Sequence, residues 1–404
     1  MSIRVRSAVL CAALFAVPAA ATPSTTPPSP ADKPVEATDW FSRMTQMSEA
    51  LTSLLVDILP ERRVRDRVVE ARATETARRL AVLARAVHTA SPRGAPDADP
   101  SIPIVASLFA DEADRLARVV AQGPSSHARA LARSVTSSCI GCHTRSDRMP
   151  ELQPPPSTLD LSGLRPIDRA DVLIATHRFA AARKELDALL ANDRLGEEDP
   201  SGWERAVTHA LLLEVRTQRS PDGALALVER VLNGPVPLAR AWEDADGWRR
   251  SLLAWKQENH PWPGTPDEAF RDARRLIEEA EAAPRVPGDR SADVLYLRAT
   301  AALHDFLASN PRGPAAARAF SLLSVSYWRL GELDLWSLAR LYDEACIREA
   351  PHTDLAAECY ERYDDLVRAD EAGNGGRLSP ETAQRLKTFR DLAGVAPRRG
   401  PKPR

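Results

Sequence analysis

The stretch LARSVTSSCIGCH (residues 131–143) combines a helical pattern with two closely spaced cysteines. Four of its residues recur every three or four positions and share one helical face: Leu131, Val135, Cys139 and Cys142. A histidine follows the second cysteine directly. Cys-x-x-Cys-His is the attachment signature of a c-type haem, in which both thiols form thioethers with the porphyrin and the adjacent imidazole binds the iron. The pattern therefore predicts one covalent haem c per chain, held by Cys139, Cys142 and His143.

A redox-active dithiol and a zinc site are the two alternative interpretations of this cysteine pair. Redox-active Cys-x-x-Cys sites of the thioredoxin type belong to βαβ folds, and the sequence around residues 131–143 has no such pattern. Zinc needs a second ligand pair, and Cys346 and Cys359, thirteen residues apart, do not have the required spacing. Because a chain of this composition contains the haem motif by chance in about one case in a thousand, we favour haem.

The N-terminus has the features of a secretory signal peptide. Arg4 and Arg6 precede the apolar run AVLCAALFAVPAAA, whose last small residues predict cleavage after about Ala21. The run is too short for a membrane span, so we expect no integral membrane segment after cleavage. Cys11 lies in the middle of the run, away from the position of a lipid-anchored cysteine. The sequence therefore predicts an exported, periplasmic protein.

The composition favours an all-α fold. Alanine, leucine and arginine are abundant and aromatic residues make up only 5 % of the chain. The sequence divides into six expected segments: a signal peptide (1–21), a proline-rich linker (22–38), a four-helix c-type cytochrome domain (39–145), a linker (146–165), tetratricopeptide-like repeats (166–370), and a short helix with a basic tail (371–404). The formal charge of −2 gives no reason to expect a nucleic acid partner.

The first of the four helices, expected at residues 39–59, carries an apolar seam with alternating spacings of four and three. Its seam residues are Trp40, Met44, Met47, Leu51, Leu54 and Ile58. Three further helices follow: about 61–89, about 101–121, and one from Ser125 or Ser126 to the CIGCH motif. Short connections predict an up-down-up-down bundle, which brings Met44, Met47 and His88 to the same pole as the motif.

Residues 39–145 resemble class II c-type cytochromes, the cytochrome c-prime and c-556 group. The resemblance rests on CIGCH in the last of four helices and on Met44-Thr-Gln-Met47 near the start of the first. It covers about a quarter of the chain and implies a four-helix bundle around the haem. The family commonly has an aromatic residue and an arginine three and four positions after the histidine, where this chain has Ser146 and Asp147.

The sixth position of the iron decides what the haem does. A thioether from Met44 or Met47 favours electron transfer, whereas an open position lets small gases bind. His88 is a third candidate for this position. We therefore expect an electron-transfer protein, with a gas-binding sensor and an interaction scaffold with a structural haem as alternatives. The sequence shows no Ser-His-Asp set, phosphate loop or paired-carboxylate motif, so we do not expect an enzyme.

The second half of the chain has the pattern of paired helices. Phe320, Leu323, Tyr327 and Gly331 keep the spacing of a tetratricopeptide repeat, and residues 170–190 form a weaker unit. Such stacks present a surface to another protein, so we expect a redox partner protein or a peptide to bind there. A short last helix is expected to begin at Ser379-Pro380 and to end near Gly394, before the basic tail.

Cys346 and Cys359 lie in two consecutive predicted helices. In an exported protein free thiols tend to pair, so we expect a disulfide between them, with two buried free thiols as the alternative. Closing this loop should contribute about 3 kcal/mol.

Overall fold

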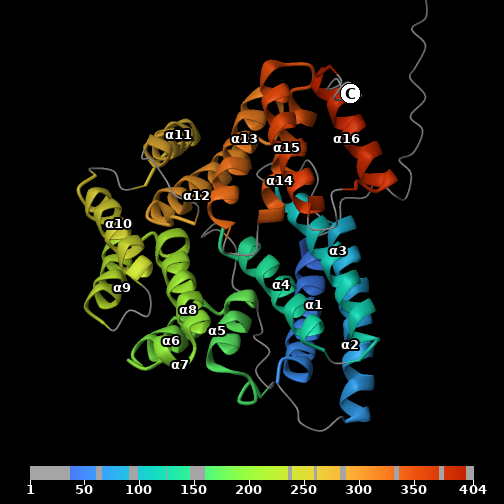
Figure 1. Cartoon of the computed structure of the whole chain (residues 1–404), viewed down its shortest axis with the longest axis vertical. Coiled ribbons are helices and arrows are strands. Elements are labelled where there is room, and N and C mark those ends of the chain that lie inside the picture. The colour runs from blue at the N-terminus through green and yellow to red at the C-terminus, as the bar shows by residue number, and fades with distance from the viewer. Residues whose placement is uncertain are drawn as a thin grey trace, which may run out of the picture. The chain divides into compact units, whose positions relative to one another are not determined.

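The computed structural model describes residues 37–60, 66–90, 99–123, 125–145, 160–234, 239–258, 262–282, 288–331, 336–372 and 377–396. Every regular element in these ranges is a helix and none is a strand, which confirms the all-α prediction (Figure 1). None of the described helices is long and apolar enough to cross a bilayer. The predicted signal peptide, almost all of the proline-rich linker, residues 146–159 of the second linker and the end of the basic tail lie outside the described residues.

The first four helices, called here the N-terminal helices, are α1 (Ala37–Ile58), α2 (Arg67–Ala90), α3 (Ile102–Val120) and α4 (Ser126–His143). Each packs on the next along the chain, and α1 also contacts α4. The seam predicted on α1 faces this core, because Met44, Met47, Leu51, Leu54 and Ile58 are all buried. The observed bounds fall within two residues of the expected ones, apart from the start of α2.

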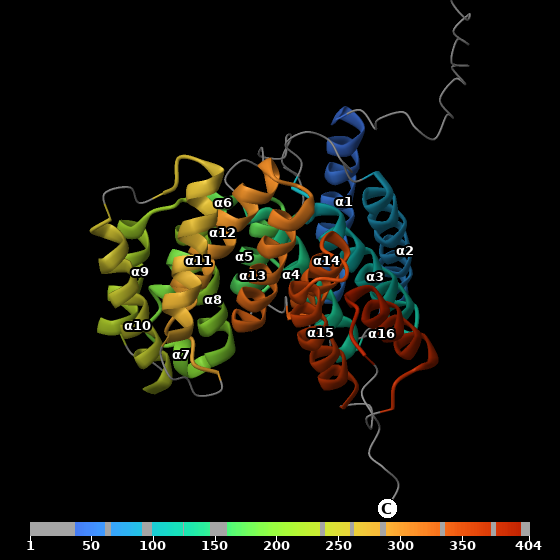
Figure 2. The same ribbon diagram turned by 90° about the horizontal axis from the view of Figure 1, so that it is seen from above.

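The remaining elements are the C-terminal helices. They are α5 (Pro166–Ala175), α6 (Phe179–Leu190), α7 (Leu195–Glu198), α8 (Pro200–Leu212), the π-helix η2 (Leu213–Thr217), α9 (Pro221–Asn233), α10 (Ala239–Lys256), α11 (Pro266–Ala282), α12 (Asp293–Ser309), α13 (Gly313–Arg329), α14 (Trp336–Glu349), α15 (Asp354–Ala372) and α16 (Pro380–Ala393). Their largest contacts join neighbours in the sequence, such as α11 with α12 and α13 with α14 (Figure 2).

Proline and capping residues set many of the helix starts. Seven of the described helices, α3, α5, α8, α9, α11, α13 and α16, have a proline in their first two positions, where its missing N–H costs no helical hydrogen bond. At α16 the Ser379 side chain accepts a hydrogen bond from the Thr382 amide at 3.0 Å. Gly394 ends this helix at a φ of 77°, in the left-handed region that favours glycine. The predicted last helix is thereby confirmed.

Residues 35–404 form one compact unit, in which the N-terminal and C-terminal helices share a single apolar core. The helices α4 and α5 lie side by side, and α3 contacts α14 (Figure 1). A buried carboxylate reinforces the first contact. Asp168 of α5 accepts hydrogen bonds from Arg133 of α4 at 3.2 Å, from Arg165 at 2.8 Å and from Arg205 of α8 at 2.7 Å. Burial would raise the pKa of Asp168, but the hydrogen bonds from Arg165 and Arg133 hold it well below its usual range.

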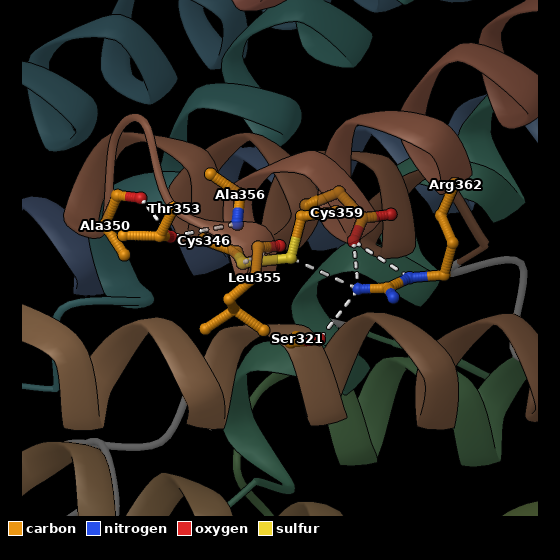
Figure 3. The surroundings of a disulfide bond; sticks show 9 residues. Ser321, Cys346, Ala350, Thr353, Leu355, Ala356, Cys359 and Arg362 are labelled. Atoms are coloured by element: carbon orange, nitrogen blue, oxygen red, sulfur yellow. Dashed lines mark hydrogen bonds and ion pairs between the residues drawn. A yellow bond between two sulfur atoms is a disulfide. The ribbon is translucent and has the colours of Figure 1, made fainter. Parts of the chain in front are cut away.

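Cys346 of α14 and Cys359 of α15 form a disulfide with an S–S distance of 2.07 Å (Figure 3). Both residues are fully buried. The Arg362 guanidinium lies 3.3 Å from the Cys359 sulfur and also donates to the Ser321 hydroxyl at 2.8 Å. The disulfide and this arginine therefore tie α15 to both α14 and α13.

Candidate functional site

The C-terminal end of α4 presents the two remaining described cysteines. Cys139 is buried, Cys142 is half-buried, and both are free thiols. Three contacts fix this helix. Ser125 caps its start by accepting from the Ala128 amide at 3.0 Å. Glu112 of α3 accepts hydrogen bonds from the hydroxyls of Ser134 at 3.0 Å and Ser138 at 2.5 Å. Since cysteines three apart share one helical face, both thiols turn toward the interior of the N-terminal helices.

One apolar cavity of about 40 Å³ adjoins the motif. Its lining comes from all four N-terminal helices: Trp40, Met44, Met47, Val87, Ile102, Val105, Ala106, Phe109, Ser138, Cys139, Cys142 and His143. A water needs roughly 10–15 Å³, so the cavity has room for about three. A macrocycle could enter only if the surrounding apolar side chains moved outward.

The structure brings five predicted site residues to this cavity: Cys139, Cys142, His143, Met44 and Met47. The other candidate for the sixth position lies elsewhere. At the end of α2, His88 lines a separate cleft of about 550 Å³ between α3 and the helices α13, α14 and α16. Of the three side chains considered for the sixth position, only the two methionines share a cavity with the motif histidine.

His143 is buried, and its imidazole is neutral at pH 7. Burial, followed by the nearby His177, lowers its pKa to about 4, although the backbone carbonyl of Ala175 favours the protonated form. Its Nδ1 atom is buried and makes no hydrogen bond. A neutral imidazole offers a ring nitrogen lone pair to a metal ion, which is the form that haem iron requires.

The Cys139 thiol is poorly suited to thiol–disulfide exchange. Burial, together with Cys142 and Glu112, raises its pKa well above the usual value. Reactive Cys-x-x-Cys dithiols have a lowered pKa, because the thiolate is the nucleophile and the metal ligand. The Cys139 thiol therefore fits a thioether bond to haem c better than a redox-active dithiol.

Two histidines lie close to the site in ways that the sequence did not indicate. His177, between α5 and α6, has its ring centroid 5.6 Å from that of His143, with the rings nearly perpendicular. Its backbone φ is 62°, in the left-handed region that non-glycine residues rarely adopt. His304 of α12 belongs to a buried polar network beside the motif. Neither histidine has a sequence spacing that relates it to the motif, so no local signal indicated their place at the site.

The buried network begins two residues after His143. The Nη1 atom of Arg145 donates to the Ser101 hydroxyl at 2.5 Å and to Asp99 Oδ2 at 3.3 Å. His304 Nδ1 lies 3.0 Å from Asp99 Oδ2, and its Nε2 lies 3.1 Å from the hydroxyl of Tyr327 on α13. Burial lowers the pKa of His304 to about 4 against the attraction of Asp99. Burial would raise the pKa of Asp99, but His304 and Arg145 hold it well below its usual range.

The site thus offers two thiols, a neutral buried imidazole and two thioethers around one apolar cavity. Groups of these kinds could hold a c-type haem and bind its iron. The Nδ1 atom of His143 is buried without a hydrogen-bond partner, whereas the ring interacts with the Ala175 backbone carbonyl and lies beside His177. Comparison with known proteins adds no family: no family model, curated protein or solved structure matches the chain.

Proposed function

We propose that this chain is an exported c-type cytochrome that transfers electrons through one covalent haem. The observation that carries the proposal is the convergence of Cys139, Cys142, His143, Met44 and Met47 on one apolar cavity. When bound, the haem supplies a one-electron iron couple. Cys139 and Cys142 would hold it as thioethers, and His143 together with Met44 or Met47 would bind the iron.

The remaining lining residues would exclude water. Val105, Phe109 and Val87 are buried and apolar, so they would keep solvent from the metal and limit the reorganisation that accompanies electron transfer. The placement of both methionines supports electron transfer over gas sensing, since a thioether at the sixth position competes with small gases. No enzyme activity is part of the proposal.

We propose further that α1–α4 form a four-helix bundle of the class II cytochrome type. The contacts of α1 with α2, α2 with α3, α3 with α4 and α1 with α4 support it, as does the motif at the end of α4. The C-terminal helices would form a tetratricopeptide-like stack, supported by their packing between sequence neighbours. That stack would dock a redox partner protein or a peptide in the periplasm.

Optical spectra test the proposal and identify the sixth ligand. The chain is made in a host that attaches haem c, and spectra are recorded oxidised and reduced, with and without carbon monoxide. We expect a low-spin haem that does not bind carbon monoxide rapidly. Met44→Leu and Met47→Leu form a matched pair, because leucine nearly conserves the volume. One of them should produce a high-spin, carbon monoxide-binding haem, and the other should resemble the unsubstituted protein.

Two results would speak against electron transfer. If the unsubstituted protein is high-spin and binds carbon monoxide at once, the gas-sensor hypothesis takes its place. If neither leucine variant differs from the unsubstituted protein, neither methionine is the ligand.

A further inference from the structure

The buried network beside the motif joins the N-terminal to the C-terminal helices at the haem-binding end of α4. Asp99 and Ser101 precede α3, and Arg145 follows α4, whereas His304 and Tyr327 belong to α12 and α13. Asp99, Ser101, Arg145, His304 and Tyr327 are each at most 9 % exposed. The network therefore lies in the core, where salt screens charges little and the effective dielectric constant is low.

Of these five residues, Arg145 and Asp99 carry full charges. Arg145 is a buried cation three residues after Cys142, and it pairs with Asp99 at 3.3 Å. Asp99 is the anionic partner of Arg145. His304, which is neutral at pH 7, contacts the same carboxylate through its Nδ1 atom. Arg145 satisfies only part of its hydrogen-bonding capacity, because its Nε and Nη2 atoms are buried without partners. The pair therefore places a positive and a negative charge in the core, next to the C-terminal end of α4.

A buried charge acts on the iron in a predictable direction. Reduction removes one positive charge from the haem, so a nearby cation favours the ferrous form and a nearby anion favours the ferric form. We propose that the Arg145–Asp99 pair sets the reduction potential of the haem, and that His304 and Tyr327 make the C-terminal helices part of this electrostatic control. The inference rests on the proposed function, because it requires the haem to occupy the cavity beside Cys142.

His304 connects the C-terminal helices to the Arg145–Asp99 pair. Its Nδ1 holds the Asp99 carboxylate, and the Tyr327 hydroxyl fixes its Nε2. Arg216 of η2 extends the network by donating to the same hydroxyl at 3.0 Å. A movement of α12 or α13 would therefore displace the anion from its cation and change the field at the iron. This arrangement would let a partner docked on the C-terminal helices alter the redox equilibrium.

The test is the midpoint potential of haem-loaded variants that remove one charge at a time. Arg145→Gln should lower the potential and Asp99→Asn should raise it, each by about tenfold in the reduction equilibrium constant, or 59 mV for one electron. His304→Leu should also shift the potential by more than the control variants do, because it frees the Asp99 carboxylate that His304 Nδ1 holds at 3.0 Å. Matched controls are Arg115→Gln and Asp111→Asn, two exposed residues of α3, which should shift it far less.

A charge effect shifts the midpoint potentials of Arg145→Gln and Asp99→Asn in opposite directions. A loss of packing would shift both potentials in the same direction. Arg145→Lys keeps the charge and should leave the potential near that of the unsubstituted protein. If Arg145→Gln does not fold, Asp99→Asn and Arg145→Lys decide the question. The inference is overturned if Arg145→Gln and Asp99→Asn shift the potential in the same direction, or if Asp99→Asn leaves it unchanged.

The haem content distinguishes a failure of the proposed function from a failure of the inference about Arg145 and Asp99. Haem content is measured first on every protein by intact mass and by the reduced spectrum. An unsubstituted chain without haem refutes the proposed function itself. A loaded chain whose potential ignores these charges refutes only the inference about Arg145 and Asp99.

Discussion

Replacing Asp168 with asparagine tests whether a buried carboxylate holds α4 against the C-terminal helices. Asp168 is 2 % exposed and accepts hydrogen bonds from Arg133, Arg165 and Arg205. A hydrogen bond to a charged group contributes roughly 1.5–3 kcal/mol. The arginines are 27–50 % exposed and can turn to water after the substitution, which reduces the loss. We therefore expect the free energy of unfolding to fall by about 3 kcal/mol.

Urea unfolding followed by circular dichroism measures this loss, and Asp187→Asn is the matched control. Asp187 is exposed and pairs with Arg230 at 3.1 Å, so its loss should cost less than about 1 kcal/mol. The difference between Asp168→Asn and the unsubstituted protein should also depend on pH. The pKa of Asp168 in the folded state lies below its value in the unfolded chain, and the unfolded value is near 4. The contribution of Asp168 to the free energy of unfolding is therefore complete above about pH 5 and is lost as the pH falls below that value. Equal stability of the Asp168 and Asp187 variants at pH 7 would refute this reasoning.

Two further predictions concern the C-terminal helices. Replacing both Cys346 and Cys359 with alanine should lower the free energy of unfolding by about 3 kcal/mol, as estimated from the 13-residue separation, and a urea midpoint equal to that of the oxidised protein would contradict this. Burial raises the pKa of Asp343 to about 6, so the folded state binds more protons than the unfolded state between about pH 4 and pH 6 and loses stability as the pH rises through that window. Asp343→Asn should therefore match the unsubstituted protein near pH 4 and be more stable at pH 8, and urea midpoints at the two pH values check the sign.

Local signals in the sequence were sufficient for much of the fold. The seam from Met44 to Ile58 predicted which face of α1 is buried, because helical periodicity depends only on neighbouring residues. Ser379 and Gly394 predicted the bounds of α16 through their capping chemistry. The same local reasoning placed both cysteines of the motif on one face and both methionines toward the core.

The contacts between distant segments were not predictable from a single sequence. His304 lies 203 positions after Ser101, yet their side chains are 3.3 Å apart. His177 reaches His143 only because α5 packs on α4, and no spacing rule connects the two. The expectation that His88 lies near the motif assumed that all helix ends at one pole share one cavity. In the structure the preceding residue, Val87, lines the cavity at the motif, whereas the His88 side chain lines a separate cleft with Pro103 and Ile104 of α3.

The intact mass of the chain, produced in a host that attaches haem c, tests the central claim most directly. We predict one porphyrin adduct on the unsubstituted chain and on the Cys346→Ala/Cys359→Ala variant, and none on Cys139→Ala/Cys142→Ala. An unsubstituted chain without the adduct, or an adduct that survives the loss of Cys139 and Cys142, would contradict the account.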